Sequence, residues 1–154
     1  MVSLISDIET TLRTYNVNMS SLGRVVTQVP VEDLEFIWPQ VKAQLEKALD
    51  GSYSTYDILE YIKENRMQLW ISWNEGIEAS FVTEVCDYPQ MRVMRWVLAG
   101  GSNMESWLKP LTEKVEAWAK KNNCQRLEIV GRKGWTKVLS DYEPQAVYFV
   151  KEIK

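Results

Sequence analysis

The sequence predicts an α/β (α+β) fold in which a mixed, mostly antiparallel central sheet is flanked by helices. Apolar residues recur at helical spacing before residue 66, alternate from 67 to 98, and return to helical spacing from 107 to 121. A short apolar strand follows that last helix, and such a strand–helix–strand connection favours a parallel strand pair. The 154 residues, 45% of them apolar, are enough for one domain with one core.

Residues 1–22 are expected to form an N-terminal helical arm and hinge. Apolar side chains recur at helical spacing between Leu4 and Tyr15. The stretch NVNMSSLG, from 16 to 23, is rich in residues that favour turns and offers little to bury. The domain proper is therefore expected to span residues 23–154.

One strand and two helices open the domain. Residues 24–29 are rich in β-branched side chains and end at a proline, which predicts a strand. A single apolar stripe predicts a helix over residues 31–49, and Pro39 inside it is expected to bend or break that helix. A second, shorter helix is expected to begin at the capping pair Ser54 and Asp57.

Three runs with a period of two predict an antiparallel meander of strands at residues 67–73, 77–86 and 91–98. Short turns rich in Asn, Gly, Asp and Pro separate these runs. Trp70 and Trp73 lie three positions apart on the first strand, so they are expected to point to opposite faces of the sheet. At most one of them can enter any single core.

A glycine-bearing turn at residues 99–103 joins the third meander strand to a helix. Pro110 interrupts the helical pattern, so the main helix is expected to start there. Residues 126–130 then predict a short strand parallel to the third meander strand. A short helix or turn is expected over 131–139, and a last strand rich in Val, Tyr and Phe over 146–153.

Composition excludes several classes of function. Eighteen basic and twenty-one acidic residues leave a net charge of −3, which disfavours general binding of nucleic acid. The absence of histidine excludes Ser-His-Asp and Cys-His catalysis and every His-ligated metal site. Cys86 and Cys124 form no C-x-x-C pair, so they are expected to be reduced, buried thiols, with no metal bound.

The expected setting is a soluble protein made in the cytoplasm. The sequence contains no long apolar run and no basic region ahead of an apolar one, which disfavours a membrane span and a signal peptide. Seven Trp and seven Tyr are more than one small core needs. Some of these rings are therefore expected on the surface, where they favour contact with other proteins.

The order of elements, with a glycine-bearing turn between the fourth strand and a long helix, resembles the GNAT acyl-CoA N-acyltransferase fold. The stretches MQLWISWNEGIEASFVTEVCDYPQMRVMRWVLAGG, WLKPLTEKVEAWAKKNNCQRLEIVGRKGW and YFVKEIK are similar to small GNAT-like proteins of tailed bacteriophages and prophages. This resemblance covers about residues 24–154. It implies acetyl-CoA as the cofactor, the host-cell cytoplasm as the location, and incorporation in a virion as a second location.

In the GNAT family the turn after the fourth strand holds the pyrophosphate of acetyl-CoA on backbone N–H groups. Gly100 fits that turn, but Val97 stands where the family has Gln or Arg, and Ser102 where it has Gly or Ala. Glu105 would form a capping box with Ser102 and repel a diphosphate. The turn is therefore either a phosphate loop or a plain connection from strand to helix. The cofactor-binding residues that the resemblance implies are Leu98, Gly100, Gly101, Ser102, Asn103 and Met104, with Arg132 and Lys133 for the 3′-phosphate or for an acidic partner surface.

The resemblance also implies catalytic candidates. Tyr142 occupies about the position of the family's tyrosine that protonates the leaving thiolate, although Glu143 and Pro144 stand where a Gly-aromatic pair is common. Glu84 and Glu128, each on a predicted strand, are the candidates for a base that accepts the amine proton. For each of the two glutamates, strand alternation favours a solvated position on the outer face of the sheet over a catalytic role.

Two main hypotheses follow. The favoured one is a non-catalytic GNAT-fold phage protein that binds other proteins, including virion components, through residues 1–20 and exposed aromatic side chains. The alternative is an active acetyl-CoA-dependent N-acetyltransferase that acts on an unidentified amine. A third hypothesis is a sensor that holds a small molecule or peptide between the splayed fourth and fifth strands.

Overall fold

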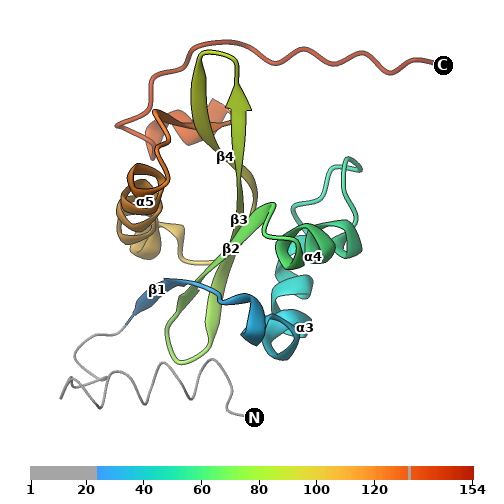
Figure 1. Cartoon of the computed structure of the whole chain (residues 1–154), viewed down its shortest axis with the longest axis vertical. Helices are drawn as coiled ribbons and strands as arrows, with labels where there is room; N and C mark the ends of the chain where they lie inside the picture. Colours follow the sequence, from blue (N-terminus) through green and yellow to red (C-terminus); the bar gives the residue numbers. More distant parts are fainter. Residues whose placement is uncertain (1–23, 132) are drawn as a thin grey trace.

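The computed structural model describes residues 24–131 and 133–154. Within them a five-stranded sheet has the order β1-β2-β3-β4-β5 (Figure 1). This mixed, mostly antiparallel sheet flanked by helices is the predicted fold class. The strands are β1 (Val25–Gln28), β2 (Met67–Trp73), β3 (Ile77–Tyr88), β4 (Met91–Gly101) and β5 (Arg126–Ile129).

Strand pairing follows the predicted meander. Neighbouring strands from β1 to β4 are antiparallel, and β5 is parallel to β4, as expected for two strands joined by a helix. The pairing of β3 with β4 continues to Ala79 opposite Gly101. The prediction of a turn at residues 99–103 was therefore wrong at its start, because Gly100 and Gly101 belong to β4.

Helices cover both faces of the sheet. One face carries α3 (Leu34–Glu46) and α4 (Thr55–Lys63), and α5 (Met104–Lys121) lies on the other (Figure 1). A single 3-10 turn, η1 (Val31–Asp33), precedes α3, so the α-helix is shorter than the predicted range of 31–49. The capping box of α4 is confirmed: Ser54 Oγ accepts from the Asp57 N–H at 3.1 Å.

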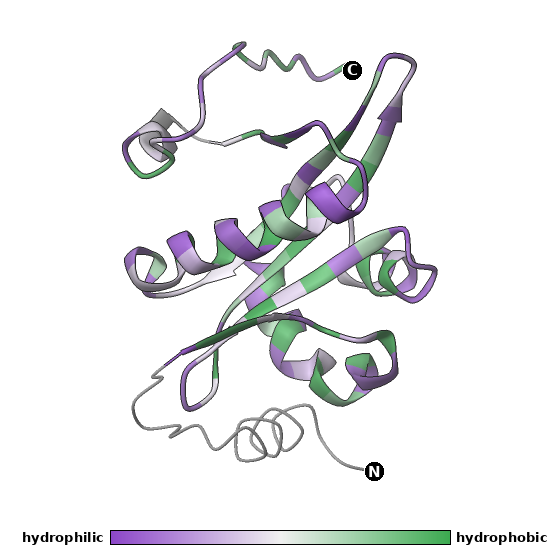
Figure 2. Cartoon of the chain, turned by 60° about the vertical axis from the view of Figure 1, so that its left-hand side comes forward, coloured by the Kyte–Doolittle hydropathy of each residue, from purple (hydrophilic) through white to green (hydrophobic). Residues whose placement is uncertain are grey.

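The sheet separates two apolar clusters rather than bounding one core (Figure 2). Trp73 packs with Leu69 and Ile71 toward α3 and α4, whereas Trp70 packs with Phe81 toward α5. Both tryptophans are buried, on opposite faces as the spacing predicts. Trp70 also meets Trp118 of α5 edge-on, with ring centroids 6.1 Å apart.

Neither internal proline ends its helix. Pro39 lies inside α3, and α5 starts at Met104, six residues before Pro110, so the predicted start at Pro110 was wrong. A proline at position 110 leaves the carbonyl of Ser106 without its usual N–H partner four residues on. The Arg24 side chain supplies a substitute, because its Nη1 donates to that carbonyl at 3.2 Å.

The C-terminal segment also differs from prediction. Residues 146–153 form no strand in the structure; instead they run extended and stand away from the body of the molecule (Figure 1). A short 3-10 helix, η2 (Lys133–Lys137), precedes them within the region where a short helix or turn was expected. Strand pairing is decided by the presence of a partner edge, which the local sequence pattern does not specify.

The predicted arm and hinge, residues 1–22, lie outside the described residues. Among the helices that the structure describes, none combines the length and the apolar character that crossing a membrane requires.

Candidate functional site

The connection from β4 to α5 is the first part of the candidate site. Only Ser102 and Asn103 separate the strand from the helix. Asn103 is the N-cap residue in a left-handed conformation with φ of 59°, and its side chain makes no capping bond. The predicted capping box between Ser102 and Glu105 is therefore absent, because the helix begins one residue later than that box requires.

Neighbouring groups of the protein form hydrogen bonds with Ser102 and Asn103. The Ser102 N–H donates to the Glu78 carbonyl at 3.0 Å, and the Ser102 carbonyl accepts from Trp107 Nε1 at 2.5 Å. The Ser106 N–H donates to the Asn103 carbonyl at 2.9 Å. The two connecting residues are thus tied to β3 on one side and to α5 on the other.

A buried carboxylate lies beside the same connection. The Glu78 side chain is 7% exposed, and its two oxygens accept from Nε and Nη2 of Arg24 at 2.5 and 2.9 Å. Ser72 Oγ donates to Glu78 at 2.7 Å. The guanidinium of Arg24, with smaller contributions from Ser72 and Asn103, holds the pKa of Glu78 below its ordinary value.

Close packing explains both glycines of the connection. A Cβ at Gly100 would lie 2.4 Å from the Gln44 carbonyl oxygen of α3. Gly101 has a φ of +137°, and a Cβ there would lie 2.4 Å from the Glu78 carbonyl oxygen. Each glycine is thus required by a neighbouring backbone.

Two features of this arrangement are unfavourable for binding a pyrophosphate. Such a ligand needs several convergent N–H donors at a helix N-terminus, without competing negative charge. The Ser102 N–H is used by β3, and Glu105 places a carboxylate in the first turn of α5. The Glu78 carboxylate also lies beside the turn, where Arg24 pairs with it. Of the other residues implied for the cofactor, Leu98 packs toward α3 and α4 and Met104 toward the α5 cluster.

The second part of the site is the place where β4 and β5 separate. Their pairing covers only Val93 to Trp96 of β4, and β4 continues alone on that side to Gly101. Val97 forms a β-bulge at the point of separation, because Trp96 and Leu98 both have partners on β3 and Val97 has none.

Tyr142 lies at this point, on the α5 face of the sheet. Burial raises the pKa of Tyr142, and the neighbouring Trp96 indole offsets part of that rise. Within the described residues neither the Tyr142 hydroxyl nor Trp96 Nε1 completes a hydrogen bond of good geometry, although both atoms are buried. A buried hydroxyl without a full partner is uncommon and marks a position that can accept one.

The carboxylates of Glu84 and Glu128 lie together on the other face. Arg95 stands between them on β4, with Nη1 3.6 Å from Glu84 and Nη2 3.9 Å from Glu128. Arg95 Nη2 also donates to the Tyr88 hydroxyl at 2.5 Å. The structure therefore brings both predicted bases into one ion-pair cluster, and it places Tyr142 on the opposite face of the sheet.

Glu84 also lines a hollow of about 490 Å³ at the start of β2. Tyr61 and Arg66 line the hollow from the end of α4, and Trp118 and Asn122 line it from the end of α5. No signal in the sequence indicates this space, because the residues around it come from segments far apart along the chain.

The remaining candidate residues are two basic residues near η2 and the two cysteines. Arg132 lies outside the described residues, and Lys133 begins η2. Cys86 and Cys124 are free thiols, as predicted, but they are half-buried rather than buried. Burial raises the pKa of both thiols, which disfavours a reactive thiolate. No group of metal-binding side chains gathers in the part of the chain that the structure describes.

Comparison with known proteins shows the fold. No protein-family model and no curated protein matches the chain. Among solved structures, an aminoglycoside acetyltransferase from an uncultured soil metagenomic sample, in complex with sisomicin, superposes with a TM-score of 0.66 at 14% identity, over 87% of this chain and 99% of that chain.

Two further structures agree. A predicted acetyltransferase from Clostridium acetobutylicum, solved with acetyl-CoA, has a TM-score of 0.61 at 16% identity, over 85% of this chain and 96% of that one. A GNAT family acetyltransferase from Staphylococcus aureus has a TM-score of 0.61 at 14% identity, over 85% and 99% of the two chains. The chain therefore has a GNAT-like fold, and its activity has to be argued from its own residues.

Proposed function

We propose that this protein is a non-catalytic GNAT-fold component that binds other proteins, with a virion as the setting that the sequence resemblance implies. The observation that carries the proposal is that β3 and α5 hydrogen-bond to the two residues connecting β4 to α5. Ser102 and Asn103 are tied to β3 and α5, and Glu105 places negative charge in the first turn of α5, where the fold family holds a diphosphate.

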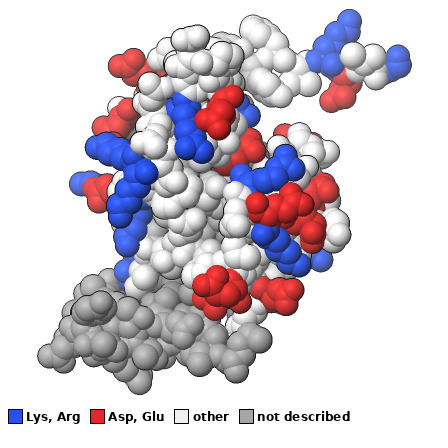
Figure 3. Space-filling model, viewed as in Figure 1, with Lys and Arg blue, Asp and Glu red and all other residues white. Residues whose placement is uncertain are grey.

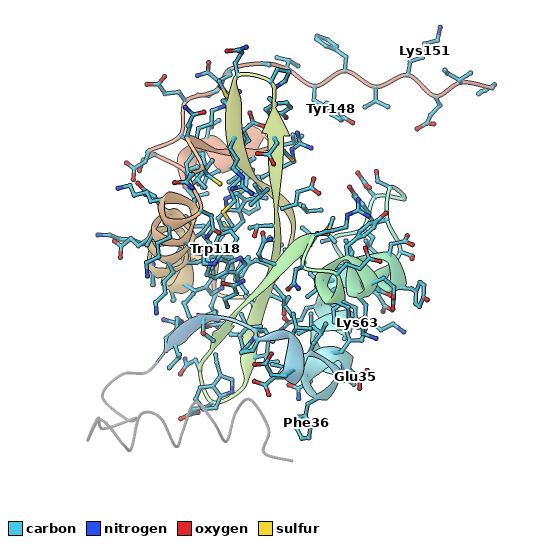
Figure 4. All side chains as sticks on the ribbon, viewed as in Figure 1. Glu35, Phe36, Lys63, Trp118, Tyr148 and Lys151 are labelled. Carbon is cyan, nitrogen blue, oxygen red and sulfur yellow. The ribbon has the colours of Figure 1, made fainter. Side chains whose placement is uncertain are left out.

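An exposed aromatic surface supports protein binding. Phe36 of α3 is 54% exposed and Tyr56 of α4 is 67% exposed, and Phe36 points away from the body of the molecule (Figure 4). A shallow apolar groove of about 430 Å³ lies beside Tyr56 and is also lined by Trp38 and Leu59. An exposed aromatic ring beside an apolar groove, as at Tyr56, is typical of protein–protein contact sites.

The charge distribution also fits a protein partner. Acidic and basic side chains are interspersed over the face shown in Figure 3, with uncharged surface between them. Such a face has no broad field of one sign to gather polyanions. Residues 1–20 remain a proposed second contact region.

The test is thermal unfolding of the full chain with and without millimolar acetyl-CoA and coenzyme A. A ligand present at a hundred times its Kd would stabilise the folded state by about 2.7 kcal/mol, which a melting curve resolves readily. We expect no shift of the midpoint. A saturable rise with either compound would contradict the proposal, and isothermal titration would then give the affinity.

One observation favours acetyl transfer instead: the buried Tyr142 hydroxyl beside Trp96, where β4 and β5 separate. If that activity exists, Tyr142→Phe should reduce acetyl-CoA-dependent acetylation of an amine panel by about a hundred-fold or more, the lower end of what a positioned proton donor contributes. Tyr148→Phe, at a ring that is 75% exposed, is the matched control and should leave it unchanged. Equal rates for the two variants and the unaltered chain would remove Tyr142 from consideration.

A further inference from the structure

The C-terminal tail, defined as residues 146–153, exposes an unusual amount of apolar surface. Phe149 is 87% exposed, Ile153 96%, Tyr148 75% and Val147 71%. Figures 1 and 4 show the tail running extended beyond the end of the sheet, with Tyr148 and Lys151 far from the helices. A run of five apolar residues, AVYFV, is typical of a strand that is buried on both faces.

The sheet has an open edge at β5, to which a further strand can add. β5 is the last strand in the sheet order, so among the described residues its outer edge has no strand partner. Leu127 of β5 packs toward the α5 cluster, while Arg126 and Glu128 face the other side. An open edge presents unpaired backbone N–H and C=O groups, which readily accept a further strand.

The chain holds the tail away from its own β5. Leu139 is 8% exposed, and Tyr142 is half-buried with its hydroxyl buried beside Trp96, so the chain is anchored just before the tail. Only three residues, Glu143 to Gln145, connect this anchor to the tail, and Pro144 fixes its own φ and favours an extended residue before it. A short, stiff hinge of this kind opposes folding back and favours exchange between chains.

We propose that the tail of one copy pairs as an added antiparallel strand with the β5 edge of a second copy, and that the exchange is reciprocal. One two-fold contact then covers both apolar tails and both open edges. With Glu152 opposite Arg126, Val150 lies opposite Glu128 and Phe149 opposite Ile129, which places Phe149 on the α5 face of the second copy's sheet. This dimer does not depend on whether coenzyme binds.

The first test is the mass of the full chain in solution, measured by sedimentation and light scattering over a wide concentration range. We expect twice 17.9 kDa for the unaltered chain and a monomer after deletion of residues 146–154 or with Phe149→Asp. Val31→Asp changes an apolar residue that is 37% exposed on η1, and should leave the dimer intact. Far-UV circular dichroism checks that each variant is folded.

Two results would overturn the proposal: a monomeric full chain at every concentration, or a deletion variant that stays dimeric. A cross-link decides which edge the tail occupies. Glu128→Cys with Val150→Cys, in a chain that also carries Cys86→Ser and Cys124→Ser, should form a disulfide between two chains upon oxidation. A disulfide within one chain would show that the tail folds back on its own β5, and no disulfide would exclude this pairing.

Discussion

Glu78 is the single residue that most strongly determines the geometry of the β4–α5 connection. Its backbone carbonyl accepts from Ser102, and its carboxylate accepts from Arg24 and Ser72. Because the side chain is only 7% exposed, its charge is compensated by protein groups rather than by water. Arg24 is 22% exposed and remains in contact with solvent, so losing the pair costs less than losing one between two fully buried ions.

Glu78→Gln should lower the free energy of unfolding by about 1–3 kcal/mol at neutral pH, because the guanidinium of Arg24 loses its charged partner. Urea unfolding measures the change. Glu113→Gln, at an exposed position on α5, is the matched control and should stay within about 0.5 kcal/mol of the unaltered chain. A Glu78→Gln variant as stable as that control would show that the pair contributes nothing.

The same pair predicts a dependence on pH. The pKa of Glu78 is lowered in the folded state, so its stabilisation is fully present above the ordinary carboxyl pKa of about 4.3 and is lost as the pH falls through the lowered folded value. The difference in stability between the unaltered chain and Glu78→Gln should therefore shrink below about pH 4. A difference that stays constant down to about pH 2 would contradict the assigned cause.

At the scale of elements, α3 is locked to the far end of the sheet. Gln44 of α3 donates from Nε2 to the Ile77 carbonyl at 3.0 Å and accepts from Ser80 Oγ at 2.5 Å. The backbone of α3 passes so close to β4 at this point that only glycine fits at position 100. The conformation of β4 just before α5 is thus set by helix packing on the opposite face of the sheet.

Gly100→Ala should lower the free energy of unfolding by about 1–3 kcal/mol, since its Cβ would lie 2.4 Å from the Gln44 carbonyl oxygen and force α3 to move. Thermal or urea unfolding measures the loss. Gly134→Ala adds the same methyl group where no atom lies within 4 Å, and should change stability little. Equal stability of the two variants would argue against this contact.

At the scale of the whole molecule, an exchanged tail couples stability to concentration. If the folded state is a dimer and the unfolded state a monomer, each ten-fold rise in protein concentration stabilises the dimer by about 1.4 kcal/mol. The melting temperature of the full chain should therefore rise with concentration, and that of the chain lacking residues 146–154 should not. Scanning calorimetry across a roughly hundred-fold range checks this, and a full-length midpoint independent of concentration would contradict it.

Local patterns predicted most elements correctly. The periods of two and of 3.6 placed the meander and the helices on both sides of it, and Ser54 with Asp57 predicted the start of α4. These features depend on neighbours within a few residues, which a single sequence displays. Pro110 misled the prediction of where α5 begins, because the compensating donor, Arg24, lies just before β1 and far from α5 along the chain.

The sequence by itself determined the absence of imidazole chemistry, the order of the elements up to β5, and the difference from the phosphate pattern of GNAT proteins at Val97 and Ser102. Tertiary structure alone decided that the Arg24–Glu78 ion pair lies beside the β4–α5 connection. These two residues are 54 positions apart, and the register of three strands brings them together. It likewise joined Glu84 to Glu128 through Arg95 and left the tail unpaired. Register and edge pairing are properties of strands brought together by the fold, which is why no local pattern displays them.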